Sequence, residues 1–146
     1  MASILVTGGT GNLGRHVVPL LRAQGHDLRV LSRRPRANAD GIEYVVGDTV
    51  SGVGLDAAVA GIDTVVHLAG SGKGDDVGTA HLADAAREAR VGHVVMISVV
   101  GADRMPIGYF GRRIAQSGAS PHPACRSRCC ARRSSTTSSG GCSAAW

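Results

Sequence analysis

A glycine-rich segment near the N-terminus has the residue types and spacing to bind a phosphate group. It follows a short apolar run and reads Thr7-Gly8-Gly9-Thr10-Gly11-Asn12-Leu13-Gly14. Gly8 can turn the chain, Gly11 can let backbone approach a pyrophosphate, and Gly14 can let a helix pack on a strand. A helix beginning here would aim its free N–H groups at that phosphate. The candidate binding residues are Gly8, Thr10, Gly11, Asn12, Leu13 and Gly14. A glycine-rich turn without a ligand is the alternative.

The residues after the second apolar run bear on the choice of dinucleotide. At this place an acidic residue would accept hydrogen bonds from a free ribose 2′-hydroxyl, whereas arginine would bind a 2′-phosphate. The chain has Ser32-Arg33-Arg34 and no acid. We therefore expect Arg33 and Arg34 to favour NADP over NAD, with Arg15 adding positive charge on the same side. A basic loop in solvent is the alternative.

Five short apolar runs alternate with amphipathic stretches through the first hundred residues, which is typical of parallel strands joined by helices. The predicted strands are Ser3–Thr7, Asp27–Ser32, Ile42–Val46, Thr64–Leu68 and His93–Ser98. The predicted helices are Asn12–Gln24, Leu55–Ala60 and Asp75–Arg90. Together they predict an α/β fold: a Rossmann-type, doubly wound parallel sheet of about five strands that is truncated at its C-terminal side.

Single residues mark where these helices begin and end. Asp75 or Asp76 could cap the third helix, and Gly25 and Gly92 stand where glycines commonly end helices. Pro19 falls inside the first helical pattern, where we expect it to kink the helix rather than break it.

Composition and charge divide the chain into two unlike parts. With 43% hydrophobic and 18% charged residues, the chain is not of a disordered, fibrous or membrane-spanning class. Its net charge of +5 lies mostly at one end: residues 117–146 hold four arginines, no acid and all four cysteines. We therefore predict an NAD(P)-binding domain over residues 1–115 and an irregular Ser-, Arg- and Cys-rich tail over 116–146.

Other site classes and partners are less favoured. The N-terminus lacks the apolar stretch of a signal peptide, so we expect a cytoplasmic protein that does not enter a membrane. The cysteines lack the paired spacing of a zinc site, and we expect no metal. His67 and His81 have no ligand partners at metal spacing and are predicted to be structural.

Five segments in combination resemble the short-chain dehydrogenase/reductase superfamily, and most closely its atypical NmrA-like branch. They are T-G-G-T-G-N-L-G, L-S-R-R-P, V-G-D, V-V-H-L-A-G and I-S-V-V-G-A, and the resemblance covers residues 1 to about 115. It implies that Asp48 lies beside the adenine and that the backbone of Leu68, Ala69 and Gly70 lines the cofactor site. Without the resemblance, Asp48 could simply cap a turn, and Ala69-Gly70 could end a strand.

The same resemblance implies a catalytic set of serine, tyrosine and lysine. Ser98 and Tyr109 match the first two positions, whereas Arg113 stands where the superfamily has lysine. Arginine keeps the positive charge but differs from an ammonium group in shape and charge distribution. The expected function is that of an NADP-dependent oxidoreductase acting on a small molecule. The alternatives are a binding or redox-sensing module without turnover and a truncated inactive product.

A shifted reading frame could explain the tail. With codons chosen within the degeneracy of the code, the frame shifted near Ala115 permits the continuation AERxVAASGLPFALLRATQFHDL, which resembles the superfamily. Only one leucine of it is forced, by Cys129-Cys130. The rival is a basic tail that binds nucleic acid, which is less favoured because Trp146 is its only aromatic residue.

Overall fold

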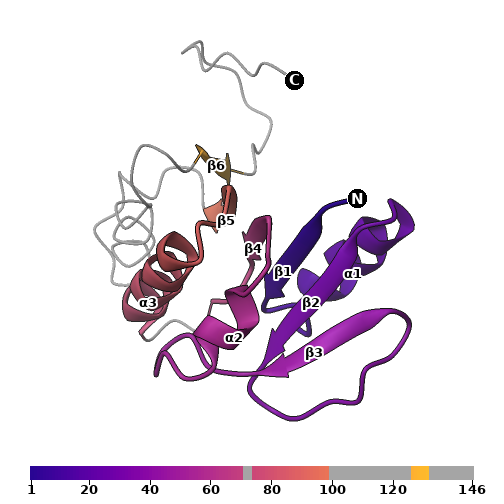
Figure 1. Ribbon diagram of the computed structural model, residues 1–146, viewed down its shortest axis with the longest axis horizontal. Helices are drawn as coiled ribbons and strands as arrows, with labels where there is room; N and C mark the ends of the chain where they lie inside the picture. Colours follow the sequence, from indigo (N-terminus) through magenta and orange to yellow (C-terminus); the bar gives the residue numbers. More distant parts are fainter. Residues whose placement is uncertain (71–73, 99–125, 132–146) are drawn as a thin grey trace.

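The computed structural model describes residues 1–70, 74–98 and 126–131, which form a parallel sheet flanked by helices (Figure 1). The strands are β1 Ser3–Thr7, β2 Asp27–Ser32, β3 Ile42–Val46, β4 Thr64–His67, β5 His93–Ser98 and β6 Arg126–Ala131. The helices are α1 Gly14–Ala23, α2 Leu55–Val59 and α3 Asp75–Glu88. In the described part of the chain the strand order is β3-β2-β1-β4-β5-β6.

This order confirms the predicted Rossmann-type fold. All of the neighbouring strands pair in parallel. The chain winds outward from β1 through β2 to β3, and then returns to the other side of β1 to add β4 and β5. Loops that leave β1 and β4 therefore diverge, and a crevice opens between them at the carboxyl ends of the strands.

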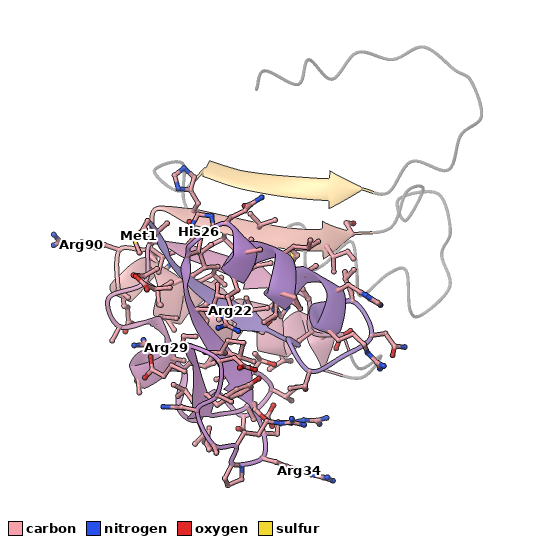
Figure 2. All side chains as sticks on the ribbon, turned by 90° about the vertical axis from the view of Figure 1, so that its right-hand side faces the viewer. Met1, Arg22, His26, Arg29, Arg34 and Arg90 are labelled. Carbon is pink, nitrogen blue, oxygen red and sulfur yellow. The ribbon has the colours of Figure 1, made fainter. Side chains whose placement is uncertain are left out.

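Alternate residues of the central strand β1 enter two different cores. Leu5 packs in a cluster with residues of α2 and α3, whereas Ile4 and Val6 pack with Val18 of α1. Leu5 and Val6 are fully buried. Helices therefore cover both faces of the sheet, α1 on one and α2 with α3 on the other (Figure 2). Burial on both faces explains why β1 is apolar at consecutive positions.

The helix ends differ from the prediction in two places. Neither Asp75 nor Asp76 caps α3, because the N-cap residue is Gly74 in a left-handed conformation. Gly92 does not end α3 either, since Ala89 is the C-cap residue and Arg90 has the positive φ of 57°. Gly25, in contrast, follows α1 with φ of 81°, as expected.

Pro19 is tolerated inside a continuous α1. The helix runs on both sides of Pro19 and buries Val18 against the sheet. Proline removes a backbone donor from the helix. Packing of the apolar face outweighs that loss here, in agreement with the expectation that Pro19 does not break the helix.

Strand β6 lies in the segment that we expected to be irregular. It pairs in parallel with β5 from His93↔Arg126 to Ser98↔Ala131, so β5 is an inner strand and not the edge of the sheet (Figure 1). The hydrogen bonds of a strand join backbone groups and need no apolar periodicity at an edge position. The Ser-, Arg- and Cys-rich composition of residues 116–146 was therefore not a sufficient reason to predict an irregular segment throughout.

Arg29 ties β2 to the end of α2. Its Nη1 donates to the carbonyl oxygens of Ala58 at 3.0 Å and Ala60 at 2.8 Å. Its Nε donates to Glu43 Oε2 on the paired strand β3 at 2.7 Å. The last carbonyl groups of a short helix have no partners within the helix. Arg29 satisfies carbonyl groups at this end and thereby ties α2 to β2.

Candidate dinucleotide-binding site

A pocket of about 430 Å³ occupies the crevice at the carboxyl ends of β1, β2, β3 and β4. This volume lies in the range typical of small-molecule sites. All of the candidate binding residues except Gly14 and Arg34 line the pocket: Gly8, Thr10, Gly11, Asn12, Leu13, Arg33, Asp48, Leu68, Ala69 and Gly70. Four loops that are separate in the sequence thus meet around one cavity.

The glycine loop is closed by its own backbone. Gly11 N–H donates to the carbonyl oxygen of Gly8 at 2.9 Å, which folds the loop back on itself. A Cβ atom on Gly14 would collide with the carbonyl oxygen of Gly8 and with the backbone of Gly9. Gly14 does not line the pocket. Its lack of a side chain lets the start of α1 pack closely on the backbone of the loop, which is the packing role that its spacing predicted.

Free backbone donors remain at the tip of this loop. Among the hydrogen bonds within the described residues, the N–H groups of Asn12 and Leu13 donate to no protein acceptor. Arg15 N–H donates to the carbonyl oxygen of Gly11 as α1 begins. Unpaired N–H groups at the start of a helix bind anions, so the tip of the loop can hold a phosphate.

Arg15 extends over the same loop. Its Nη2 donates to Asn12 Oδ1 at 2.7 Å, and both side chains are exposed. The bond holds a positive charge beside the loop tip. A phosphate bound to the N–H groups there would therefore lie near a cation.

The two arginines after β2 occupy different places. Arg33 lines the pocket together with Ser32 and Leu31. Arg34 does not line it and points away from the protein body (Figure 2). The backbone turns after β2, and Ser32 holds this turn because its hydroxyl donates to the carbonyl oxygen of Arg34 at 2.8 Å. Of these two arginines, Arg33 is the one that lines the cavity in which a ligand would lie.

Asp48 both lines the pocket and holds a turn. Its Oδ1 accepts a hydrogen bond from Val50 N–H at 3.1 Å, and its backbone N–H donates to the carbonyl oxygen of Val53 at 3.0 Å. His81 of α3 adds a bond from Nδ1 to the carbonyl oxygen of Thr49 at 3.2 Å. The two readings of Asp48 are thus compatible, since the carboxylate orders the loop that forms one wall of the pocket.

The sequence did not reveal a polar group in the floor of the pocket. Thr7, His67 and Asp75 all line the cavity and are all buried. Thr7 and His67 end paired strands, and Thr7 Oγ1 lies 2.6 Å from His67 Nδ1. The signal available in the sequence was that Thr7 and His67 are polar residues at the ends of otherwise apolar runs.

The candidate catalytic residues are only partly placed. Ser98 ends β5, is half-buried and does not belong to the pocket lining given by the described residues. Tyr109 and Arg113 lie outside the described residues. Within residues 1–70, 74–98 and 126–131, no three metal-ligating side chains gather into a site, and no helix is long and apolar enough to cross a membrane.

The residues present fit a dinucleotide. A side chain at Gly8 would collide with the loop after β4, because its Cβ would lie 2.6 Å from the backbone nitrogen of Ala69. Free N–H groups and Arg15 match a phosphate, and Arg33 lies where the second strand ends. The position at the reversal of strand order is the one at which such folds bind their ligands. The fold and site together define a Rossmann-type dinucleotide-binding domain.

The comparison with known proteins agrees with this class. Residues 8–121 match the NAD(P)H-binding family, and the chain belongs to that family. One similar solved structure is a short-chain dehydrogenase/reductase superfamily protein from Agrobacterium tumefaciens with bound NAD. It is 27% identical with a TM-score of 0.72, and the match covers 87% of this chain and 48% of that protein's chain. MoeE5 in complex with UDP-glucuronic acid and NAD has the same fold, with a TM-score of 0.74 at 23% identity, 88% of this chain and 53% of its own.

In the curated relatives the matching segment is a smaller share of the whole protein than in these solved structures. A (4-alkanoyl-5-oxo-2,5-dihydrofuran-3-yl)methyl phosphate reductase of Streptomyces griseus is 35% identical over 68% of this chain and 36% of its own length. A 3-beta-hydroxysteroid dehydrogenase of Mycolicibacterium neoaurum is 39% identical over 47% of this chain and 19% of its own. The chain thus spans about a fifth to a third of these relatives and about half of the solved structures.

Proposed function

We propose that this chain is the dinucleotide-binding part of a short-chain oxidoreductase that prefers NADP and acts on a small molecule in the cytoplasm. The reductase and dehydrogenase relatives support the reaction class. The observation that carries the cofactor preference is Arg33 in the pocket lining at the end of β2, with no acidic side chain from the Ser32-Arg33-Arg34 turn. A guanidinium binds a 2′-phosphate through paired hydrogen bonds, whereas NAD offers only hydroxyl groups there.

Each wall of the pocket has a separate task in this proposal. The N–H groups of Asn12 and Leu13 hold the pyrophosphate, and Arg15 adds charge beside it. Arg33 holds the 2′-phosphate, and the loop ordered by Asp48 borders the adenine. The backbone from Leu68 to Gly70 lines the far wall. The bound nicotinamide supplies the hydride.

The catalytic part of the proposal concerns Ser98, Tyr109 and Arg113. Tyr109 donates a proton to the carbonyl oxygen of the substrate as hydride is transferred, and Ser98 orients that carbonyl group. Arg113 holds the cofactor ribose and its positive charge lowers the cost of ionising Tyr109. These roles come from the superfamily pattern of the sequence.

Calorimetric titration of the purified protein with NADPH and NADH tests the binding proposal. We expect saturable binding of NADPH that is at least tenfold tighter than that of NADH. Equal affinities would contradict the preference for NADP. Failure of the folded protein to bind either dinucleotide would contradict the whole proposal.

A binding or redox-sensing module of the NmrA-like kind, without turnover, is the second candidate. Arg113 in place of lysine favours it. Oxidation of NADPH with a panel of aldehydes, ketones and quinones separates the two candidates. Turnover lost in Tyr109→Phe would establish the enzyme, whereas tight binding without any turnover would establish the sensor.

A further inference from the structure

A buried chain of side chains connects the floor of the pocket to the first turn of α3. Thr7 Oγ1 lies 2.6 Å from His67 Nδ1, and His67 Nε2 lies 3.2 Å from Thr79 Oγ1. The hydroxyl of Thr79 donates to the carbonyl oxygen of Asp75 at 2.7 Å. Thr7 is 1% exposed, His67 3% and Thr79 6%, so these bonds are shielded from water. Thr79 itself does not line the pocket.

The positions of the protons in this series of hydrogen bonds follow from its last acceptor, the carbonyl oxygen of Asp75. A carbonyl oxygen only accepts, so the single hydroxyl proton of Thr79 is used on Asp75. Thr79 Oγ1 must then accept from His67, which places a proton on Nε2. In the neutral form of the imidazole, which carries one proton, Nδ1 is then an acceptor and the hydroxyl of Thr7 donates to it. The donors therefore run in one direction, from Thr7 through His67 to Thr79 and Asp75.

The series of hydrogen bonds reaches the pocket through Thr7, which immediately precedes Gly8 of the glycine loop. Thr7 is paired with His67 across β1 and β4, and its carbonyl oxygen accepts from Leu68 N–H at 3.0 Å. The strand end that presents Gly8 is thus held by backbone and side chain together. Buried hydrogen-bonded groups lose more when one partner is removed than a solvated pair does.

We propose that His67 is a positioning residue of the dinucleotide site, held as the Nε2–H tautomer, which couples the first turn of α3 to the strand end that carries the glycine loop. The proposal rests on the dinucleotide binding proposed above. It assigns a role in ligand affinity to Thr79, whose hydroxyl lies outside the pocket.

Two substitutions of Thr79 test the coupling by titration with NADPH. Thr79→Val keeps the shape but removes the acceptor for Nε2–H, and we expect the dissociation constant to rise by about three- to tenfold. Thr79→Ser keeps the hydroxyl and is expected to bind as the wild type does. Val77→Thr, an exposed position on the same helix, is the matched control and should leave the affinity unchanged. Equal affinity in Thr79→Val, or an equal loss in Thr79→Ser, would overturn the coupling.

The tautomer of His67 gives a readout that does not need a ligand. Long-range proton–nitrogen correlation spectra, assigned by comparison with His67→Gln, should show the proton on Nε2 in the folded wild type. A proton on Nδ1, or a mixture of tautomers, would overturn the assignment. If the wild type binds neither dinucleotide, the proposed function fails, and the spectrum still decides whether the proton chain exists.

Discussion

Gly8 and Ala69 approach each other backbone to backbone at the mouth of the crevice. A Cβ atom on Gly8 would lie 2.6 Å from the nitrogen of Ala69 and 2.8 Å from the carbonyl carbon of Leu68. Gly8 also has φ of 70°, which L side chains rarely adopt. The loops after β1 and β4 can therefore close around one pocket only because no side chain stands at residue 8.

Substitution Gly8→Ala should separate these two loops. We expect a loss of about 1–3 kcal/mol in the free energy of unfolding, from the collision with Ala69 and the strained φ, together with weaker NADPH binding. Denaturant unfolding and titration measure the two effects. Gly92→Ala is the control, because within the described part of the chain a Cβ at Gly92 meets an ordinary contact at 3.5 Å with the carbonyl oxygen of Asp63. Wild-type stability in Gly8→Ala would contradict the packing described.

Arg29 should stabilise the fold through carbonyl groups more than through its ion pair. Arg29→Met removes the donors to the end of α2, and we expect a cost of about 1.5–3 kcal/mol in the free energy of unfolding. Glu43→Gln removes only the charge of a half-exposed partner and should cost less than about 1 kcal/mol. Equal losses in urea unfolding of the two variants would show instead that the ion pair is the larger contribution.

Asp48 should act first through the turn that it holds. Asp48→Asn keeps an acceptor for Val50 N–H, whereas Asp48→Ala removes it. We expect NADPH affinity to fall by about threefold to tenfold in Asp48→Ala and to change less in Asp48→Asn. If the two variants lose equal affinity in titrations, the negative charge of Asp48 rather than the turn is what the ligand requires.

The sequence predicted the inner sheet well because burial on both faces leaves a clear pattern. The predicted bounds of β1, β2, β3 and β5 agree with the structure, and β4 ends one residue earlier, at His67. The glycine spacing likewise predicted the loop, since turn, close approach and helix packing each require glycine there. The strand patterns and the glycine spacing can each be recognised from residues close together in the sequence.

What the sequence did not predict depends on contacts between distant segments. Arg33 and Arg34 are equivalent as neighbours in the sequence, but only Arg33 of the two lines the pocket, while the backbone of Arg34 is held in a turn by the Ser32 hydroxyl. The set formed by Thr7, His67 and Thr79 requires β1, β4 and α3 to meet. Strand β6 depends on pairing with β5 rather than on a pattern of its own.

The position of β6 bears on the reading-frame hypothesis. The shifted reading that the codons permit places Phe-Ala-Leu-Leu-Arg over codons 126–131, the span of β6. An apolar sequence of this kind is typical of a strand in a wound parallel sheet. We predict that sequencing the gene shows an open shifted frame that encodes these residues. A stop codon in that frame, or polar residues over β6, would contradict the hypothesis.

The central claim, that Arg33 binds the 2′-phosphate of NADP, is tested most directly by the affinities of Arg33→Ala for NADPH and NADH. Loss of a charge-assisted phosphate contact costs about 1.5–3 kcal/mol, so NADPH affinity should fall by roughly 10- to 150-fold. NADH affinity should change little, and Arg34→Ala, whose side chain lies outside the pocket, should bind both dinucleotides nearly as the wild type does. Unchanged NADPH affinity in Arg33→Ala would contradict the claim.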